Sequence, residues 1–214
     1  MNIQDKINFK TAEILIDLNC VNFSPKKHFK LTSGKKSPVY CDCRRLISFP
    51  NERNQLIDFG LKKIKQIKDF QSITNIAGGE SAGIPFATMI ANKLNLPMTY
   101  IRKEKKKFGK NSQIEGLIKR KDNILLVEDL MTDGGSKVKF IDAIENVGAK
   151  VNAIFVIFNY GINKNFFPHK KKKIELIFLT KWSYILNVAF KKKILTTKDT
   201  IIIEKFLDSI GVKS

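Results

Sequence analysis

The sequence predicts an α/β fold in which a central parallel sheet is flanked by helices. Short apolar runs rich in branched side chains alternate with amphipathic segments from about residue 73 to residue 179. That alternation is typical of parallel strands joined by helical crossovers. Two of the runs, at 73–77 and 124–127, lead directly into glycine-containing loops that open amphipathic segments. In open α/β sheets, ligands bind at such loops, beyond the carboxyl ends of the strands.

Apolar periodicity places the other elements along the chain. Helical spacing predicts amphipathic helices at 3–18 and 51–68, and turn signals in 21–48 predict a hairpin or small irregular lobe between them. The expected strands are 73–77, 96–101, 124–127, 151–158 and 174–179. A lysine-rich turn at 170–173 precedes the last strand, and the segment that follows it is expected to be helical.

The chain is expected to form one domain spanning residues 1–214, because this length suits a single sizeable core. Its expected parts are an N-terminal helix and lobe in 1–50, an α/β core in 51–180 and a helical part in 181–214. No apolar run approaches the roughly 20 residues of a membrane span, and no signal-peptide pattern is present, so we expect a soluble, cytoplasmic protein. The spacing of the three cysteines fits neither a disulfide set nor a zinc site, so reduced thiols are expected.

The formal net charge is +19, and lysines outnumber arginines 34 to 5. Sequence-specific DNA-binding proteins use arginine for bidentate base contacts, and none of the familiar nucleic-acid-binding motifs is present. We therefore expect no nucleic-acid partner and no membrane partner. Solvated surface accounts for most of the charge, and the remainder favours a polyanionic small substrate.

The most informative stretch reads Asn123-Ile-Leu-Leu-Val-Glu-Asp-Leu-Met-Thr-Asp-Gly-Gly-Ser136. Its buried strand ends at two adjacent carboxylates, Glu128 and Asp129, which repel each other unless a diol or a cation binds them. The loop from Thr132 to Ser136 combines hydroxyls with two glycines at the start of a helix, which suits it to bind a phosphate. Paired acids beside such a loop favour a ligand that carries both a phosphate and a diol.

Two further stretches complete the candidate site. Residues 78–85 (GGESAGIP) form a second junction of strand, glycine loop and helix, which predicts a second phosphate site. Residues 102–116 carry too many like charges to pack in a core and are expected to be a mobile, exposed loop. His28 and His169 lie in basic turns without an acid, serine or cysteine arranged around them, so neither zinc catalysis nor a histidine triad is expected.

Residues 123–136 resemble the phosphoribosyl pyrophosphate (PRPP) motif of the type I phosphoribosyltransferases. The resemblance implies the fold of that family, a central parallel sheet flanked by helices with an N-terminal hood. It also implies that Glu128 and Asp129 hold the ribose hydroxyls while the following loop wraps the 5′-phosphate. The residues implied to bind PRPP are Glu80, Ser81, Arg102, Lys103, Lys106, Glu128, Asp129, Leu130, Met131, Thr132, Asp133, Gly134, Gly135 and Ser136.

The same resemblance identifies the other two stretches. Residues 78–85 match the loop that holds pyrophosphate, often around a strained peptide bond, which here falls near Glu80-Ser81. Residues 102–109 match the catalytic loop RKE-x-K-x-x-G, and Lys106 joins the acidic pair as a catalytic residue. Many members carry a histidine where this chain has Phe108.

Residues 29–44, FKLTSGKKSPVYCDCR, resemble the substrate-covering hood of the orotate phosphoribosyltransferases. By this resemblance Tyr40 and Cys41 lie against the orotate ring, which Thr132 also contacts. Two positions depart from the pattern: Thr32 stands where some members carry a substrate-contacting lysine, and Tyr160 where some carry an arginine for the orotate carboxylate. Lys35 or Lys36 is a candidate replacement for the missing lysine. The pair Tyr160-Gly161 and the LxTW-like stretch that ends at Trp182 match one branch of the family.

The resemblance implies a pentosyltransferase that joins orotate to PRPP, giving orotidine 5′-monophosphate and pyrophosphate in pyrimidine biosynthesis. It further implies Mg²⁺ held mainly through PRPP, with no certain protein ligand, and a homodimer with shared active sites. Two alternatives stay open at this point. A phosphoribosyltransferase for another nucleobase would keep the PRPP motif and change the hood, and a PRPP-sensing regulator bound to nucleic acid is favoured only by the charge.

Overall fold

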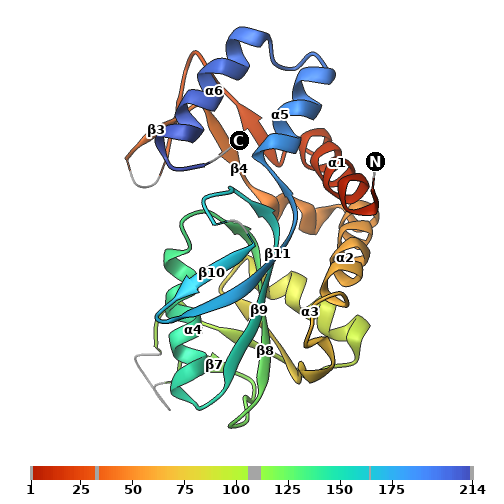
Figure 1. The fold of residues 1–214 in the computed structure, drawn as a ribbon, viewed down its shortest axis with the longest axis vertical. Coiled ribbons are helices and arrows are strands. Elements are labelled where there is room, and N and C mark those ends of the chain that lie inside the picture. The colour runs from red at the N-terminus through yellow and green to blue at the C-terminus, as the bar shows by residue number, and fades with distance from the viewer. Residues whose placement is uncertain (1, 32–33, 106–111, 164, 213–214) are drawn as a thin grey trace.

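The computed structural model describes residues 2–31, 34–105, 112–163 and 165–212. The α/β fold is confirmed, because a seven-stranded sheet in the order β10-β11-β9-β8-β5-β6-β7 runs through the molecule between helices (Figure 1). Its strands are β5 (Asn75–Gly79), β6 (Met98–Ile101), β7 (Ile114–Glu115), β8 (Asn123–Met131), β9 (Lys150–Asn159), β10 (Phe166–His169) and β11 (Lys172–Lys181).

The sheet is mixed rather than wholly parallel. Strands β11, β9, β8, β5 and β6 pair in parallel, whereas β10 and β7 pair antiparallel with β11 and β6 at the two edges. The expectation of a parallel sheet is therefore wrong at its edges. Strand β10 returns to β11 through residues 170–171 alone, the short connection that antiparallel neighbours allow, whereas β7 follows β6 after residues 102–113.

Strand β8 is longer than its apolar run suggests. Pairing with β9 continues through Glu128, opposite Val156, to Met131, opposite Asn159. The acidic pair thus lies within the part of β8 that pairs with β9, rather than beyond the end of the strand. A neighbouring strand that keeps supplying hydrogen bonds extends β8 past the point where the apolar pattern stops.

Helices cover both faces of the sheet, as expected. The helices are α1 (Ile3–Asp17), α2 (Pro50–Ile64), α3 (Gly83–Leu94), α4 (Gly135–Asn146), α5 (Trp182–Lys191) and α6 (Thr197–Ser209), with 3₁₀ turns η1 (Cys43–Ser48) and η2 (Phe70–Ser72). Alternate residues of β8 serve two cores. Leu125 and Val127 pack with residues of α2 and α3, whereas Ile124 and Leu126 pack with residues of α4. The unbroken apolar run of β8 reflects this burial on both faces.

The predicted N-terminal lobe is confirmed as two small antiparallel ladders. Strand β1 (Val21–Phe23) pairs with β4 (Val39–Cys41), and β2 (Phe29–Lys30) pairs with β3 (Lys36–Ser37). Figure 1 shows this lobe and helices α5 and α6 beyond the carboxyl ends of the parallel strands. The three cysteines are free and buried, and Sγ of Cys41 lies 3.6 Å from Sγ of Cys43. None of the helices described here combines the length and apolar character needed to cross a bilayer.

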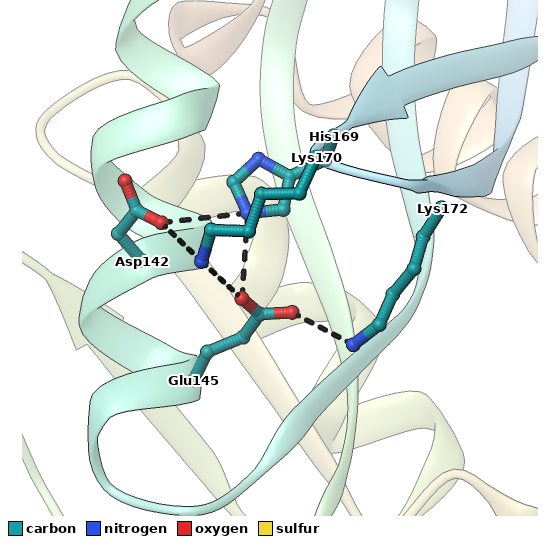
Figure 2. A network of polar contacts seen from close by, with 5 residues as sticks. All are labelled: Asp142, Glu145, His169, Lys170 and Lys172. Atoms are coloured by element: carbon teal, nitrogen blue, oxygen red, sulfur yellow. Dashed lines mark hydrogen bonds and ion pairs between the residues drawn. The ribbon is translucent and has the colours of Figure 1, made fainter.

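His169 departs from the expectation of a basic turn without acids. It ends β10 with only 4% of its surface exposed, and its Nε2 lies 3.4 Å from Oδ1 of Asp142 and 3.4 Å from Oε2 of Glu145, both on α4 (Figure 2). The ammonium groups of Lys170 and Lys172 lie 2.7 and 3.2 Å from the Glu145 carboxylate. Because these lysines neutralise the acids, we interpret the five residues as an ionic clasp that fastens the β10–β11 turn to α4.

The clasp predicts a pH-dependent loss of stability. Hydrogen bonds from Lys170 and then Lys172 lower the pKa of Glu145 from 4.5 to about 2. A carboxyl group whose pKa falls on folding stabilises the folded state above its unfolded pKa, and this contribution disappears as pH falls toward the folded value. Glu145→Gln should therefore lower the free energy of unfolding at pH 7 by about 1 kcal/mol, the scale of a partly exposed ion pair.

Urea unfolding of wild type and Glu145→Gln, measured at pH 7, 5, 4 and 3, tests the clasp. The difference between them should shrink below pH 5. Glu13→Gln is a matched control, because Glu13 forms an exposed ion pair with Lys10 across one helical turn. An equal loss for Glu145→Gln at pH 7 and pH 3 would show that the charge of Glu145 is not what stabilises the turn.

Candidate active site

The acidic pair lies near the carboxyl end of β8, a central strand between β5 and β9. Glu128 and Asp129 are 6% and 7% exposed. Successive strand residues point to opposite faces, so the two carboxylates have different surroundings. Glu128 meets Lys137 of α4, whereas Asp129 lies close enough to η1 for its charge to interact with Arg44 and Cys43.

Lys137 was not predicted as a site residue. It is 4% exposed, and its Nζ donates hydrogen bonds to Oε2 of Glu128 at 2.8 Å and to the carbonyl oxygen of Leu130 at 2.7 Å. The sequence contains one signal that identifies it. At helical spacing Lys137 shares a face with Phe140, Ile141 and Ile144, the apolar face that α4 packs against the sheet.

Burial makes both acids hard to ionise in the absence of a ligand. It raises the pKa of Glu128 to about 7, against the opposing attraction of Lys137. Burial also raises the pKa of Asp129, again opposed by Lys137. A cation or a hydroxyl donor that enters the site would favour the charged forms of the pair.

The 132–136 loop joins β8 to the N-terminus of α4, as the sequence predicts. Oδ1 of Asp133 accepts hydrogen bonds from the Gly135 N–H at 3.1 Å and from the Thr132 hydroxyl at 3.3 Å. Gly134 has a φ of +89°, and a Cβ atom there would lie 2.2 Å from the ring of Phe167 in β10. Two constraints, backbone conformation and space, thus require glycine at this position.

The other residues of the PRPP motif are placed as follows. Leu130 and Met131 belong to β8 rather than to the loop. Met131 has no exposed surface, and its carbonyl oxygen accepts the Tyr160 N–H at 2.8 Å. Gly135 and Ser136 begin the first turn of α4, and the N-terminal end of a helix attracts anions.

The 80–82 loop connects β5 to α3 beside the 132–136 loop, because β5 and β8 are adjacent parallel strands. Its Glu80-Ser81 peptide bond is cis, at the position that the resemblance indicates. Oε2 of Glu80 accepts the Lys103 N–H at 2.8 Å. This hydrogen bond ties the loop to the start of residues 102–116, the lysine-rich stretch. Ser81 is exposed.

The lysine-rich stretch begins as an ordered turn of chain after β6. The Arg102 N–H donates to the carbonyl oxygen of Gln113 at 2.8 Å, and the Arg102 guanidinium lies 3.7 Å from the Glu115 carboxylate in β7. Lys103 is exposed beside the 80–82 loop. The structure therefore brings Arg102 and Lys103 to the candidate site, whereas Lys106, Phe108 and Gly109 lie outside the described residues.

Of the predicted base-binding residues, Tyr40 and Cys41 lie in the lobe, whereas Thr132 lies in the 132–136 loop. Tyr40 is 38% exposed, and its ring centroid lies 6.0 Å from that of Phe29. Cys41, the next residue of β4, is buried. Thr32 lies outside the described residues, and the two candidate lysines, Lys35 and Lys36, are exposed.

Tyr160 follows the carboxyl end of β9 and belongs to an aromatic cluster. Its ring packs edge-on against Trp182 with centroids 5.3 Å apart and against Phe158 with centroids 5.5 Å apart. Burial raises the pKa of its hydroxyl, so the group stays neutral. Trp182 itself lies in the core, with 1% of its surface exposed.

Comparisons with known proteins agree with this geometry. Residues 52–185 match the family model of the phosphoribosyl transferase domain. A protein of Ruegeria sp. named orotate phosphoribosyltransferase is 43% identical over 202 residues, covering 92% of this chain and 88% of the relative. The crystal structure of orotate phosphoribosyltransferase from Aeropyrum pernix has a TM-score of 0.70 at 26% identity, covering 84% of this chain and 98% of that one.

The structure of Leishmania donovani UMP synthase is also similar, with a TM-score of 0.77 at 27% identity. The match covers 94% of this chain and 42% of the synthase, so this chain spans less than half of that longer protein. The similarity to the Ruegeria protein extends over 92% of this chain and 88% of that protein. The chain therefore belongs to the phosphoribosyltransferase family and, within it, to the orotate phosphoribosyltransferases.

Proposed function

We propose that this protein transfers the 5-phosphoribosyl group of PRPP to orotate, giving orotidine 5′-monophosphate and pyrophosphate in pyrimidine biosynthesis. One observation carries the proposal. The carboxyl ends of the adjacent strands β5 and β8 hold, side by side, the 80–82 loop and the acidic pair with its 132–136 loop. The acidic pair thus lies between the two loops, which fits a ligand that carries a diol between two phosphate groups.

The reaction breaks the bond between the anomeric carbon and the pyrophosphate oxygen and forms a bond from that carbon to a ring nitrogen of orotate. The ribose carries positive charge in the transition state, and no strong protein base is required. The protein has to place the reactants and balance charge. Asp129 and Glu128 supply negative charge at the strand end, where we propose that they orient the ribose diol.

The two loops provide the anion contacts. Backbone N–H groups of the 132–136 loop, at the positive end of the α4 dipole, bind the 5′-phosphate. The 80–82 loop, with Arg102, Lys103 and Lys106, neutralises the leaving pyrophosphate. Closure of the lysine-rich stretch over the site excludes water, which would otherwise compete with orotate for the ribose.

Magnesium is the proposed cofactor, and the residues of the site fit an ion that the substrate holds. Among the described residues, the one group of three potential metal ligands is Asp142, Glu145 and His169, in the clasp rather than at the two loops. Glu128 is already paired with Lys137. Phosphate oxygens are the ligands that Mg²⁺ prefers, and a bound ion would supply charge neutralisation at the pyrophosphate.

Assembly and location follow from the same proposal. We propose a homodimer in which the lysine-rich stretch of one subunit closes over the site of the other. The stretch has few apolar side chains of its own, so accurate closure needs a rigid surface opposite it. The three free, buried cysteines are in keeping with a reducing cytoplasm.

A base panel tests the substrate. Purified protein with PRPP and Mg²⁺ should release pyrophosphate with orotate and not with uracil, adenine, guanine or hypoxanthine. Uracil is the informative comparison, because it lacks only the carboxylate, and a site built to bind that carboxylate is left with unpaired donors. Tyr160, packed against Trp182, and the absence of a lysine at Thr32 favour a second candidate, a transferase for another base. Equal turnover of uracil and orotate would establish that candidate instead.

A further inference from the structure

Lys137 closes the 132–136 loop across its base. As the third residue of α4, it directs its side chain back toward the helix N-terminus, the usual direction for long side chains in helices. Its Nζ reaches the carbonyl oxygen of Leu130, which precedes the loop, at 2.7 Å. One ammonium group thus joins the two ends of the segment that we assign to the 5′-phosphate.

The same ammonium fixes Glu128 beneath the other loop. Oε2 of Glu128 accepts the Lys137 hydrogen bond, and Oε1 is buried without a hydrogen-bond partner among the described residues. Oε1 lies against the two ends of the 80–82 loop, since a Cβ atom would be 2.5 Å from it at Gly79 and 2.8 Å from it at Gly83. The carboxylate therefore occupies the space between the two substrate loops.

A buried carboxylate in this position needs a cation to remain charged. Burial disfavours its ionised form, and Lys137 is the first of the groups that oppose this effect. The charged groups that act on Glu128 are Lys137 from α4, Asp129 from β8 and Lys103 from the segment after β6. Lys103 is exposed, whereas the Lys137 and Glu128 side chains are 6% and 7% exposed, so solvent screens Lys103 far more than Lys137.

We propose that Lys137 is a positioning residue for PRPP: it holds the 132–136 loop closed and keeps Glu128 fixed and charged between that loop and the 80–82 loop. The inference rests on the proposed use of these loops for the 5′-phosphate and the pyrophosphate. If Lys137 had a purely structural role instead, its ion pair with Glu128 would affect folding and not PRPP binding.

Lys137→Met is the direct test, with Lys139→Met as the matched control, because Lys139 lies on the same helix and is exposed. Lys137→Met should raise KM for PRPP about 10-fold or more, as expected for a displaced phosphate loop, and should lower kcat less. Lys139→Met should match wild type in both constants.

The pH profile separates positioning from simple stabilisation. The low-pH limb of kcat/KM reports essential groups of the free enzyme, and burial raises the pKa of Glu128 to about 7. Removing Lys137 removes an attraction that lowers this pKa, so the limb should move to higher pH in Lys137→Met. Lys139→Met should leave the limb in place.

The double variant Glu128→Gln/Lys137→Met, which lacks both charges, keeps the proposal testable if Lys137→Met alone fails to fold. Breaking a buried ion pair by removing one partner is strongly destabilising, whereas replacing both partners often restores stability. The double variant should unfold at about the wild-type urea concentration and still bind PRPP weakly in calorimetry. Wild-type PRPP binding by the double variant, or an unmoved pH limb and wild-type KM in Lys137→Met, would overturn the proposal.

Failure of the proposed function has a different signature. If the wild-type protein uses no base in the panel, the transferase assignment fails, whereas calorimetry with PRPP alone still decides the role of Lys137. If wild type turns over orotate and Lys137→Met does so equally well, only the inference about Lys137 fails.

Discussion

Asp129→Asn is expected to lower kcat/KM by about 10²-fold or more in a protein that remains folded, the scale of losing one preorganised charge contact. Asparagine has nearly the same shape, and it keeps an oxygen that can accept the Leu130 N–H, which now donates to Oδ1 of Asp129 at 2.8 Å. The change removes the negative charge that we assign to the ribose. The loss should appear in kcat as well as in KM, because charge on the ribose develops in the transition state.

Folding should not suffer from this substitution. Burial raises the pKa of Asp129, which means that the folded state disfavours its charged form, and a neutral amide avoids that cost. Asp58→Asn is a suitable control, because Asp58 is an exposed residue of α2 that pairs with Lys93. Steady-state kinetics with orotate and PRPP, together with urea unfolding, supply both measurements. Near-normal turnover by folded Asp129→Asn would remove this carboxylate from the mechanism.

The parts of this site that could be predicted carry strong local signals. The run from Ile124 to Val127 is apolar throughout because β8 is covered on both sides, and such a short run rich in branched side chains favours a strand. The glycine loops that follow β5 and β8 were located because glycines after an apolar run stand out in the sequence. Gly134 uses the positive φ that glycine adopts readily, whereas its close approach to Phe167 appears only in the fold.

The parts that were missed depend on partners distant in the sequence. His169 looks isolated in its own segment, and its acids, Asp142 and Glu145, come from a helix that only the folded sheet brings near. Strands β7 and β10 are two and four residues long, too short for a periodic pattern to identify. Lys137 is one of 34 lysines, and only its place on the apolar face of α4 distinguishes it.

The link between Glu80 and Lys103 was missed for the same reason, and it bears on how the lysine-rich stretch works. The Lys103 N–H donates to Oε2 of Glu80, so the start of that stretch is anchored to the 80–82 loop of its own subunit. This hydrogen bond fixes the point at which the stretch leaves the sheet, but it does not determine which subunit's active site Lys106 enters. In the proposed homodimer, Lys106 serves the site of the neighbouring subunit.

Mixing two inactive variants tests that arrangement and should restore about a quarter of wild-type activity. Lys106→Ala and Asp129→Asn are each expected to lose about 10²-fold or more alone, because each removes one charge from the reacting centre. After subunit exchange in equal amounts, about half of the dimers are hybrids. If Lys106 acts across the interface, each hybrid has one site with both lesions and one site with neither, so about a quarter of all activity returns.

The opposite arrangement gives a clearly different result. If Lys106 closes over the site of its own subunit, every site in a hybrid keeps one lesion, and mixing restores nothing. Native mass spectrometry should confirm that hybrids have formed, since failed exchange would otherwise look the same. Lys106→Ala mixed with the active Asp58→Asn protein controls for dilution of the active subunits, because no site in that mixture can carry more than one damaging substitution. Hybrids confirmed by mass without recovered turnover would reject the shared site and place Lys106 on the same subunit as the Asp129 it serves.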